Sequence, residues 1–166
     1  MIRRDILRGF IAVLAVPRTA MVRASAMATV PQQGTSTPEP WTAAQMISPA
    51  AFAKELADST AGDKPTIICV GFKNFYEGSH IPGASYYGPA STADGLAQLK
   101  KFASGLAGTT DIVIYCGCCP LVHCPNVRPA FSALLEMGFA RVRLLALQQS
   151  FATDWMKPGY PVSKAS

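Results

Sequence analysis

Two short and nearly continuous apolar segments constrain the fold of this chain most strongly. They are TIICVG at 66–71 and DIVIYC at 111–116, and both are rich in β-branched residues. Strands that are apolar on both faces are typical of a parallel sheet covered by helices on either side. A third segment, RVRLLAL at 141–147, alternates at first and then becomes apolar throughout. The sequence therefore predicts three strands of a covered parallel sheet. A Pro-Gly turn at 82–83 also predicts a further short strand near residues 85–87.

Segments with helical spacing separate these strands. Ser48 is a suitable N-cap for a helix that carries Phe52 and Leu56 one turn apart. Apolar residues recur at helical spacing over 93–107, and a further helix over 128–137 has Pro129 in its first turn and Gly138 at its C-terminal cap. Alternating strands and helices predict an α/β fold, a mostly parallel sheet flanked by helices on both faces.

The first 28 residues have the organisation of an export signal. A basic start precedes a short apolar stretch, and small residues near position 26 offer cleavage sites. Arg3 and Arg4 resemble a twin-arginine motif, although an ordinary leader with chance arginines has the same composition. The apolar stretch is too short for a permanent membrane span. We expect residues 1–28 to be removed and the mature protein to be periplasmic or secreted.

The net charge of +5 belongs largely to this N-terminal segment. Five arginines and one aspartate fall within residues 1–28, whereas the rest of the chain is nearly balanced. No basic patch remains to follow a phosphate backbone, so we expect no nucleic-acid partner. Residues 29–43 are polar and proline-rich, which predicts a flexible linker before a folded domain at 44–163.

Four of the five cysteines lie close together, between Cys116 and Cys124. Cys116 ends the strand at 111–116, and the carboxyl ends of parallel strands are where such folds place their sites. The loop after it leads into a helix N-terminus, whose free N–H groups stabilise an anion. We therefore expect Cys116 to be a nucleophile with a lowered pKa. Cys69, in the first strand, is expected to be a core residue.

The order of several motifs resembles the rhodanese-like family over about residues 44–162. The motif HIPGA at 80–84 follows the first strand, and DIVIYC ends in the position of the family's active-site cysteine. GFARVRLL at 138–145 and DWMKPGYPV at 154–162 resemble the family's closing motifs. The resemblance implies the three-layer rhodanese-like fold.

The same resemblance implies a sulfurtransferase. Cys116 would take a sulfane sulfur from a small donor as a persulfide and pass it to a thiol acceptor, without a cofactor. The loop backbone at Gly117 and Cys118 would cradle the persulfide, and Arg128 would hold an anionic donor. The loop is longer than the family's, however, and Pro120 and Pro125 each remove an N–H donor from it.

The other cysteines of the loop leave alternatives open. Cys119 and Cys124 are candidate relay or resolving thiols, as is Cys118, or they form a structural disulfide. A soft metal, copper or zinc, is another alternative, with Cys116, Cys118, Cys119, Cys124 and His123 as ligands. The corresponding functions are a thiol-rich metal-binding module and a periplasmic thiol–disulfide oxidoreductase. Cys124 is also a rival nucleophile, since it lies between a histidine and Arg128 as in phosphatases, although the spacing to the arginine is shorter here.

Overall fold

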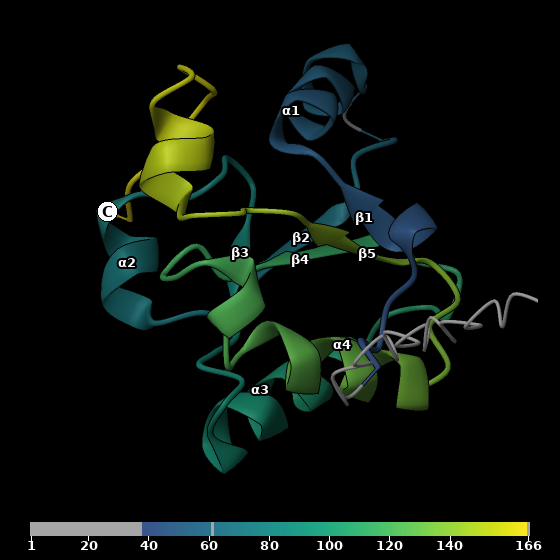
Figure 1. The fold of residues 1–166 in the computed structure, drawn as a ribbon. Helices are drawn as coiled ribbons and strands as arrows, with labels where there is room; N and C mark the ends of the chain where they lie inside the picture. Colours follow the sequence, from purple (N-terminus) through teal and green to yellow (C-terminus); the bar gives the residue numbers. More distant parts are fainter. Residues whose placement is uncertain (1–37, 61, 166) are drawn as a thin grey trace, which may run out of the picture. The chain divides into compact units, whose positions relative to one another are not determined.

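The centre of the structure is a five-stranded sheet in which every pair of neighbouring strands is parallel (Figure 1). The computed structural model describes residues 38–60 and 62–165. The strand order is β1-β5-β4-β2-β3. The strands are β1 (Met46–Ile47), β2 (Thr66–Cys69), β3 (Ser85–Tyr86), β4 (Ile112–Tyr115) and β5 (Val142–Leu145). The three apolar segments are thus the three central strands, which confirms the α/β prediction.

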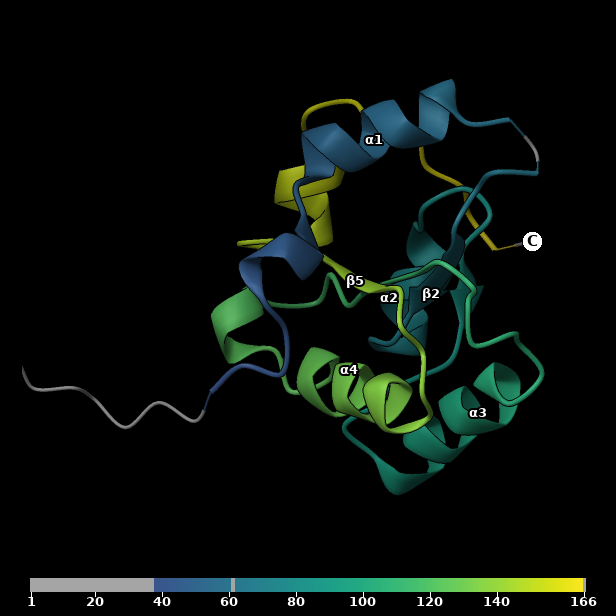
Figure 2. The ribbon, with the colours of Figure 1, turned by 90° about the vertical axis from the view of Figure 1, so that its right-hand side faces the viewer.

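Helices cover both faces of the sheet, which confirms the three-layer arrangement (Figures 1 and 2). On one face lie α1 (Pro49–Asp58) and a π-helical turn near the end of the chain, Ala152–Met156, here called the C-terminal turn. On the other face lie α3 (Ala93–Ala103) and α4 (Val127–Glu136). A short helix, α2 (Lys73–Gly78), follows β2.

The side chains of each central strand alternate between two apolar cores. In β4, Ile112 and Ile114 pack in the core under α3 and α4, whereas Val113 and Tyr115 pack in the core under α1 and the C-terminal turn. Successive side chains of a strand point to opposite faces, so the next residue, Cys116, falls on the α3 and α4 side. The strand period therefore decides which helices surround this thiol.

The helix ends follow the predicted chemistry closely. Ser48 accepts a hydrogen bond from the N–H of Ala51 at 3.2 Å, which caps α1. Gly138 follows α4 with a φ of 88°, a conformation that favours glycine. The sequence analysis missed α2 and β1. Both are short, and α2 carries no buried residue that would give it an apolar stripe.

The folded unit begins before residue 44. The linker prediction covered residues 29–43, but the ring of Trp41 packs edge-on against Phe131 of α4, with centroids 5.5 Å apart. Glu39 forms an ion pair with Arg128 at 2.6 Å. The end of the predicted linker is therefore part of the domain, because its aromatic residue covers the apolar side of α4. The predicted export signal lies outside the described residues. Among the described residues, no helix is long and apolar enough to cross a membrane.

Candidate thiol site

The site lies at the point of the sheet where the connections lead to opposite sides. From β2 the chain continues to β3 on one side, and from β4 it continues to β5 on the other. The carboxyl ends of β2 and β4 therefore border the switch point, the usual place for a site in such sheets. Gly71 and Cys116 follow these two strands. A Cβ atom on Gly71 would lie 2.7 Å from the Cys116 carbonyl oxygen, so only glycine permits this close approach.

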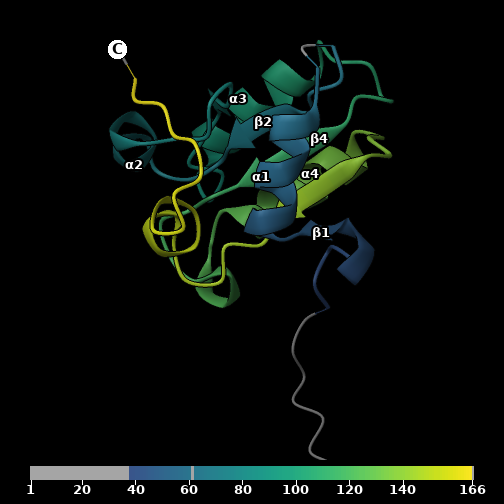
Figure 3. The ribbon, with the colours of Figure 1, turned by 90° about the horizontal axis from the view of Figure 1, so that it is seen from above.

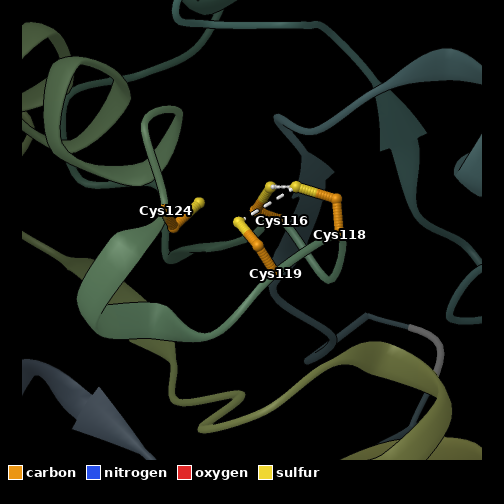
Figure 4. A group of neighbouring side chains, drawn as sticks. All are labelled: Cys116, Cys118, Cys119 and Cys124. Carbon is orange, nitrogen blue, oxygen red and sulfur yellow. Dashed lines mark hydrogen bonds between the residues drawn. The ribbon is translucent and has the colours of Figure 1, made fainter.

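The loop between β4 and α4 brings four thiols together. We call Cys116, Cys118, Cys119 and Cys124 the thiol cluster; their Sγ atoms all lie within 4.8 Å of one another (Figure 4). The Sγ of Cys118 is 3.1 Å from that of Cys116 and 3.2 Å from that of Cys119. The four cysteines are thus brought together as the sequence analysis expected. His123 is exposed and is not part of the group.

Backbone contacts fix the path of this loop. Gly117 has a φ of 79°, and its carbonyl accepts a hydrogen bond from the N–H of Phe151 at 3.0 Å. A 3₁₀ turn at Leu121–His123 then folds the chain back. Within that turn the N–H of Cys124 donates to the Leu121 carbonyl at 3.1 Å. The turn carries Cys124 back towards the end of β4, which is why cysteines eight positions apart become neighbours.

The surroundings of the cluster favour a thiolate at Cys124. The adjacent Cys116 thiol, together with the N–H groups of Asn126 and Val127 at the start of α4, lowers the pKa of Cys124 to about 6. The Cys124 thiolate and burial raise the pKa of Cys116 well above its usual range. The prediction of a lowered pKa at Cys116 was therefore wrong. The longer loop places Cys124, instead of Cys116, at the helix N-terminus.

A buried asparagine connects the cluster to the neighbouring loop. Asn126 is fully buried, and its Nδ2 donates a hydrogen bond to the Cys116 Sγ at 3.4 Å. Its Oδ1 accepts from the N–H of Ser91 at 3.0 Å. The sequence analysis missed this residue. Its position just before a helix is a weak signal, since asparagine is also a common N-cap.

Arg128, predicted to hold an anionic donor, supports the loop in this structure. Its guanidinium donates to the carbonyls of Cys124 at 3.0 Å and Val122 at 3.3 Å. It also pairs with Glu39 and lies 5.6 Å from the centre of the Trp41 ring. These contacts hold the loop between β4 and α4 against the beginning of the domain.

Two cavities meet at Cys116. The larger one, of about 410 Å³, is lined in part by Cys116, Gly117 and Cys118. The smaller one, of about 10 Å³, lies among Cys116, Cys119 and Cys124 and apolar residues of α4 and β5. Cys116 lines both cavities, whereas Cys124 lines only the small one. The cysteines that line the large cavity are therefore Cys116 and Cys118 from the thiol cluster, and Cys69 from β2.

Cys69 lies outside the cluster. It is buried in the core on the α1 side of the sheet, and burial raises its pKa to about 11. Its Sγ contacts the Cys116 carbonyl oxygen at 3.9 Å. It packs as a core residue, as the sequence analysis expected.

Comparison with known proteins shows which solved structures have a similar fold. No protein-family model matches the sequence, and no curated protein matches it. The solution structure of a rhodanese-like domain from Anabaena sp. is similar, with 22% identity and a TM-score of 0.54, over 73% of this chain and 80% of that domain. A crystal structure of the same Anabaena protein has 20% identity and a TM-score of 0.53, over 71% of this chain and 91% of the other. A protein from Bacillus halodurans has 19% identity and a TM-score of 0.55, over 72% and 76% of the two chains.

These similarities concern architecture, because the identities are low. The parallel five-stranded sheet, its helices on both faces and the cysteine at the end of β4 agree with the motif order in the sequence. The chain therefore has the fold of the rhodanese-like domains.

Proposed function

We propose that this protein transfers sulfane sulfur and that Cys116 carries the transferred atom as a persulfide. The observation that carries the proposal is the division of roles between two neighbouring thiols. Cys116 lines the 410 Å³ cavity, whereas Cys124, whose pKa is lowered to about 6, lines only the small void behind it. A nucleophile thus faces the substrate space while a buried thiolate lies beside it to take its proton.

The reaction begins with a sulfane donor, R–S–SH, in the large cavity. Cys116 and Cys124 share one negative charge, and the reactive form is the minor one, in which the proton lies on Cys124 and the charge on Cys116. In this form the Cys116 Sγ attacks the outer sulfur of the donor. The bond between the two donor sulfurs breaks, and R–S⁻ leaves with the bonding electron pair. The Asn126 Nδ2, 3.4 Å from the Cys116 Sγ, stabilises the negative charge as it forms there. An acceptor thiolate then removes the outer sulfur and restores Cys116.

Mass spectrometry of the intact protein after exposure to polysulfide tests this proposal. The wild type should gain one sulfur atom that peptide mapping places on Cys116, and Cys116→Ser should gain none while keeping its circular dichroism spectrum. Cys124→Ser should load about 100-fold more slowly, a magnitude typical of a lost proton-transfer group. Lys100→Ala, which alters an exposed residue of α3 that lines neither cavity, is the control and should load normally. If the Cys116→Ser variant gains a sulfur atom on Cys124, Cys116 is not the carrier.

A second candidate function, a metal-binding module, is favoured by one observation, the spacing of the four sulfurs. Zinc with Zn–S bonds of about 2.3 Å requires neighbouring sulfurs about 3.8 Å apart in a tetrahedral site. The Sγ separations in the cluster extend from 3.1 Å to at most 4.8 Å, so small rotations of the side chains would fit zinc or copper(I). Such a metal would lock the loop between β4 and α4. Native mass spectrometry decides: one metal per chain, lost in Cys119→Ser/Cys124→Ser, would favour this function over sulfur transfer.

A further inference from the structure

The chemistry of the large cavity beside Cys116 points to the substrate class. Its walls come from α2 and the C-terminal turn, which lie near each other at one side of the sheet (Figures 1 and 3). Aromatic and apolar side chains dominate these walls. They include Phe75, Tyr76, Tyr115, Phe151 and Met156, and the polar contributions are from Asn74, Ser79 and Ser150.

None of the described residues that line this cavity carries a charge. Several charged groups of the surrounding segments are engaged in other contacts. Lys73 pairs with Glu77 on the surface of α2 at 3.2 Å. Asp154 accepts hydrogen bonds from the N–H groups of Gln149 and Ser150. Arg128 is held by Glu39 and the loop carbonyls. The residues that line the cavity therefore include no cation to bind an inorganic anion such as thiosulfate.

The size of the cavity agrees with an organic occupant. Its volume of about 410 Å³ falls within the range of roughly 300–1,000 Å³ that is typical of small-molecule pockets. Two of its apolar walls are still open to solvent, since Phe75 is 52% exposed and Met156 is 42% exposed. An apolar group placed between them would remove this surface from water, which is favourable.

We propose that this cavity binds the apolar organic group of a thiol that accepts sulfur from Cys116, and that Phe75 and Met156 determine this specificity. The inference rests on the sulfur-transfer function proposed above. The sulfur of the acceptor thiolate, R–S⁻, attacks the outer sulfur of the Cys116 persulfide. The new bond forms R–S–SH, the bond between the outer sulfur and the Cys116 Sγ breaks, and the electron pair returns to Cys116. The group R occupies the cavity throughout.

Steady-state kinetics with two thiols of different polarity test this specificity. The acceptors are phenylmethanethiol, which is apolar, and 2-mercaptoethanesulfonate, which is anionic, with polysulfide as the donor. The KM of the wild type should be at least about 10-fold lower for phenylmethanethiol, the discrimination expected of an apolar pocket. Phe75→Ala should raise that KM about 10-fold and leave the KM for the sulfonate unchanged. An equal or lower KM for the sulfonate in the wild type would overturn the proposal.

Two further variants separate specificity from general damage. Phe72→Ala is the matched control, because Phe72 is also a phenylalanine at α2, is 40% exposed and does not line the cavity. It should behave as the wild type. Met156→Arg adds a cation to the wall and should lower the KM for the sulfonate. If Phe72→Ala and Phe75→Ala change the kinetics equally, the cavity does not determine specificity.

A binding measurement keeps the inference testable if sulfur transfer fails. Benzyl methyl sulfide has the apolar group but no thiol, so it can occupy the cavity without reacting. Titration of the ¹⁵N-labelled full chain should shift the amide signals of Phe75, Phe151 and Gly117, and Phe75→Ala should weaken the binding. If the sulfide binds but Cys116 never forms a persulfide, the proposed sulfur transfer is wrong and the assignment of the cavity as an apolar binding site stands. If sulfur is transferred but the sulfide does not bind, the assignment of the cavity as the acceptor site is wrong and the proposed function stands.

Discussion

At the scale of single residues, two glycines decide where the Cys116 sulfur lies. A Cβ atom on Gly71 would lie 2.7 Å from the carbonyl oxygen of Cys116 and 3.0 Å from its Sγ. Gly117 has a positive φ of 79°, and a Cβ atom there would lie 2.8 Å from the Cβ of Phe151. Both contacts involve backbone or the base of a side chain, which cannot move away cheaply. The close approach of β2 and the loop after β4 therefore requires glycine at both positions.

We predict that Gly71→Ala displaces Cys116. It should slow persulfide loading strongly and lower the free energy of unfolding moderately. Overpacking of this kind costs roughly 1–3 kcal/mol of the free energy of unfolding. The side chain pushed aside is the proposed sulfur carrier, so the rate of loading by polysulfide should fall by at least about 10-fold for a misplaced nucleophile. Urea unfolding and intact-mass kinetics measure the two effects. Gly62→Ala is the control, because nothing lies within 4 Å of a Cβ atom there. Normal loading in Gly71→Ala would contradict the prediction.

At the scale of elements, the start of α4 organises the site. The N–H groups of Asn126 and Val127 stabilise the Cys124 thiolate, and the side chain of Asn126 joins Cys116 to the N–H of Ser91 ahead of α3. The helix thus supplies an anion site, and the asparagine fixes the strand end against it. Arg128 holds the outer part of the same loop through its carbonyls.

We predict that Asn126→Ala lowers the free energy of unfolding by about 1–3 kcal/mol, because it leaves the Ser91 N–H without its acceptor. It should also slow persulfide loading, since the Cys116 Sγ loses a donor. Thermal unfolding and intact-mass kinetics measure these changes. Ser91→Ala keeps the N–H that donates to Asn126 and should match the wild type in both. An unchanged loading rate in Asn126→Ala would show that the asparagine is only structural.

Much of the fold was predictable from the sequence because the central strands and the helices α1, α3 and α4 have strong periodic patterns. The edge strand β1 and the short helix α2 lack such patterns. Pairing with β5 stabilises β1, and Tyr76 anchors α2 to the core on the α1 side of the sheet. At the site, close spacing predicted the cluster of thiols. The position of the charge was not predictable, because it depends on how the turn at Leu121–His123 folds Cys124 back to α4. The sequence analysis also missed the large cavity, because one of its walls is the short helix α2, which has no periodic pattern.

At the scale of the whole molecule, one ion network ties the sheet to the helix α1. Arg143 of β5 forms a two-point contact with Glu55 of α1, at 2.8 and 2.7 Å. It also pairs with Asp111, just before β4, at 2.8 Å. The three side chains are only partly exposed, between 22% and 31%. The network lies away from the thiol cluster, so it contributes to stability without contacting the proposed reaction.

We predict that Glu55→Gln lowers stability in a pH-dependent way. Arg143 holds the pKa of Glu55 below its usual value, so the carboxylate binds protons less readily in the folded state than in the unfolded state. Its contribution, on the order of 1 kcal/mol for a half-buried pair, is complete above the ordinary pKa of a glutamate and disappears as the pH falls through the lowered one. Urea unfolding at pH 7 should therefore separate the variant from the wild type, and the two should converge towards pH 3, below the ordinary pKa of about 4.3. Asp58→Asn, which breaks an exposed pair with Lys54 on the same helix, should differ little from the wild type at pH 7. A difference for Glu55→Gln that stays constant with pH would mean that the side chain acts through packing, because only a charged interaction is lost on protonation.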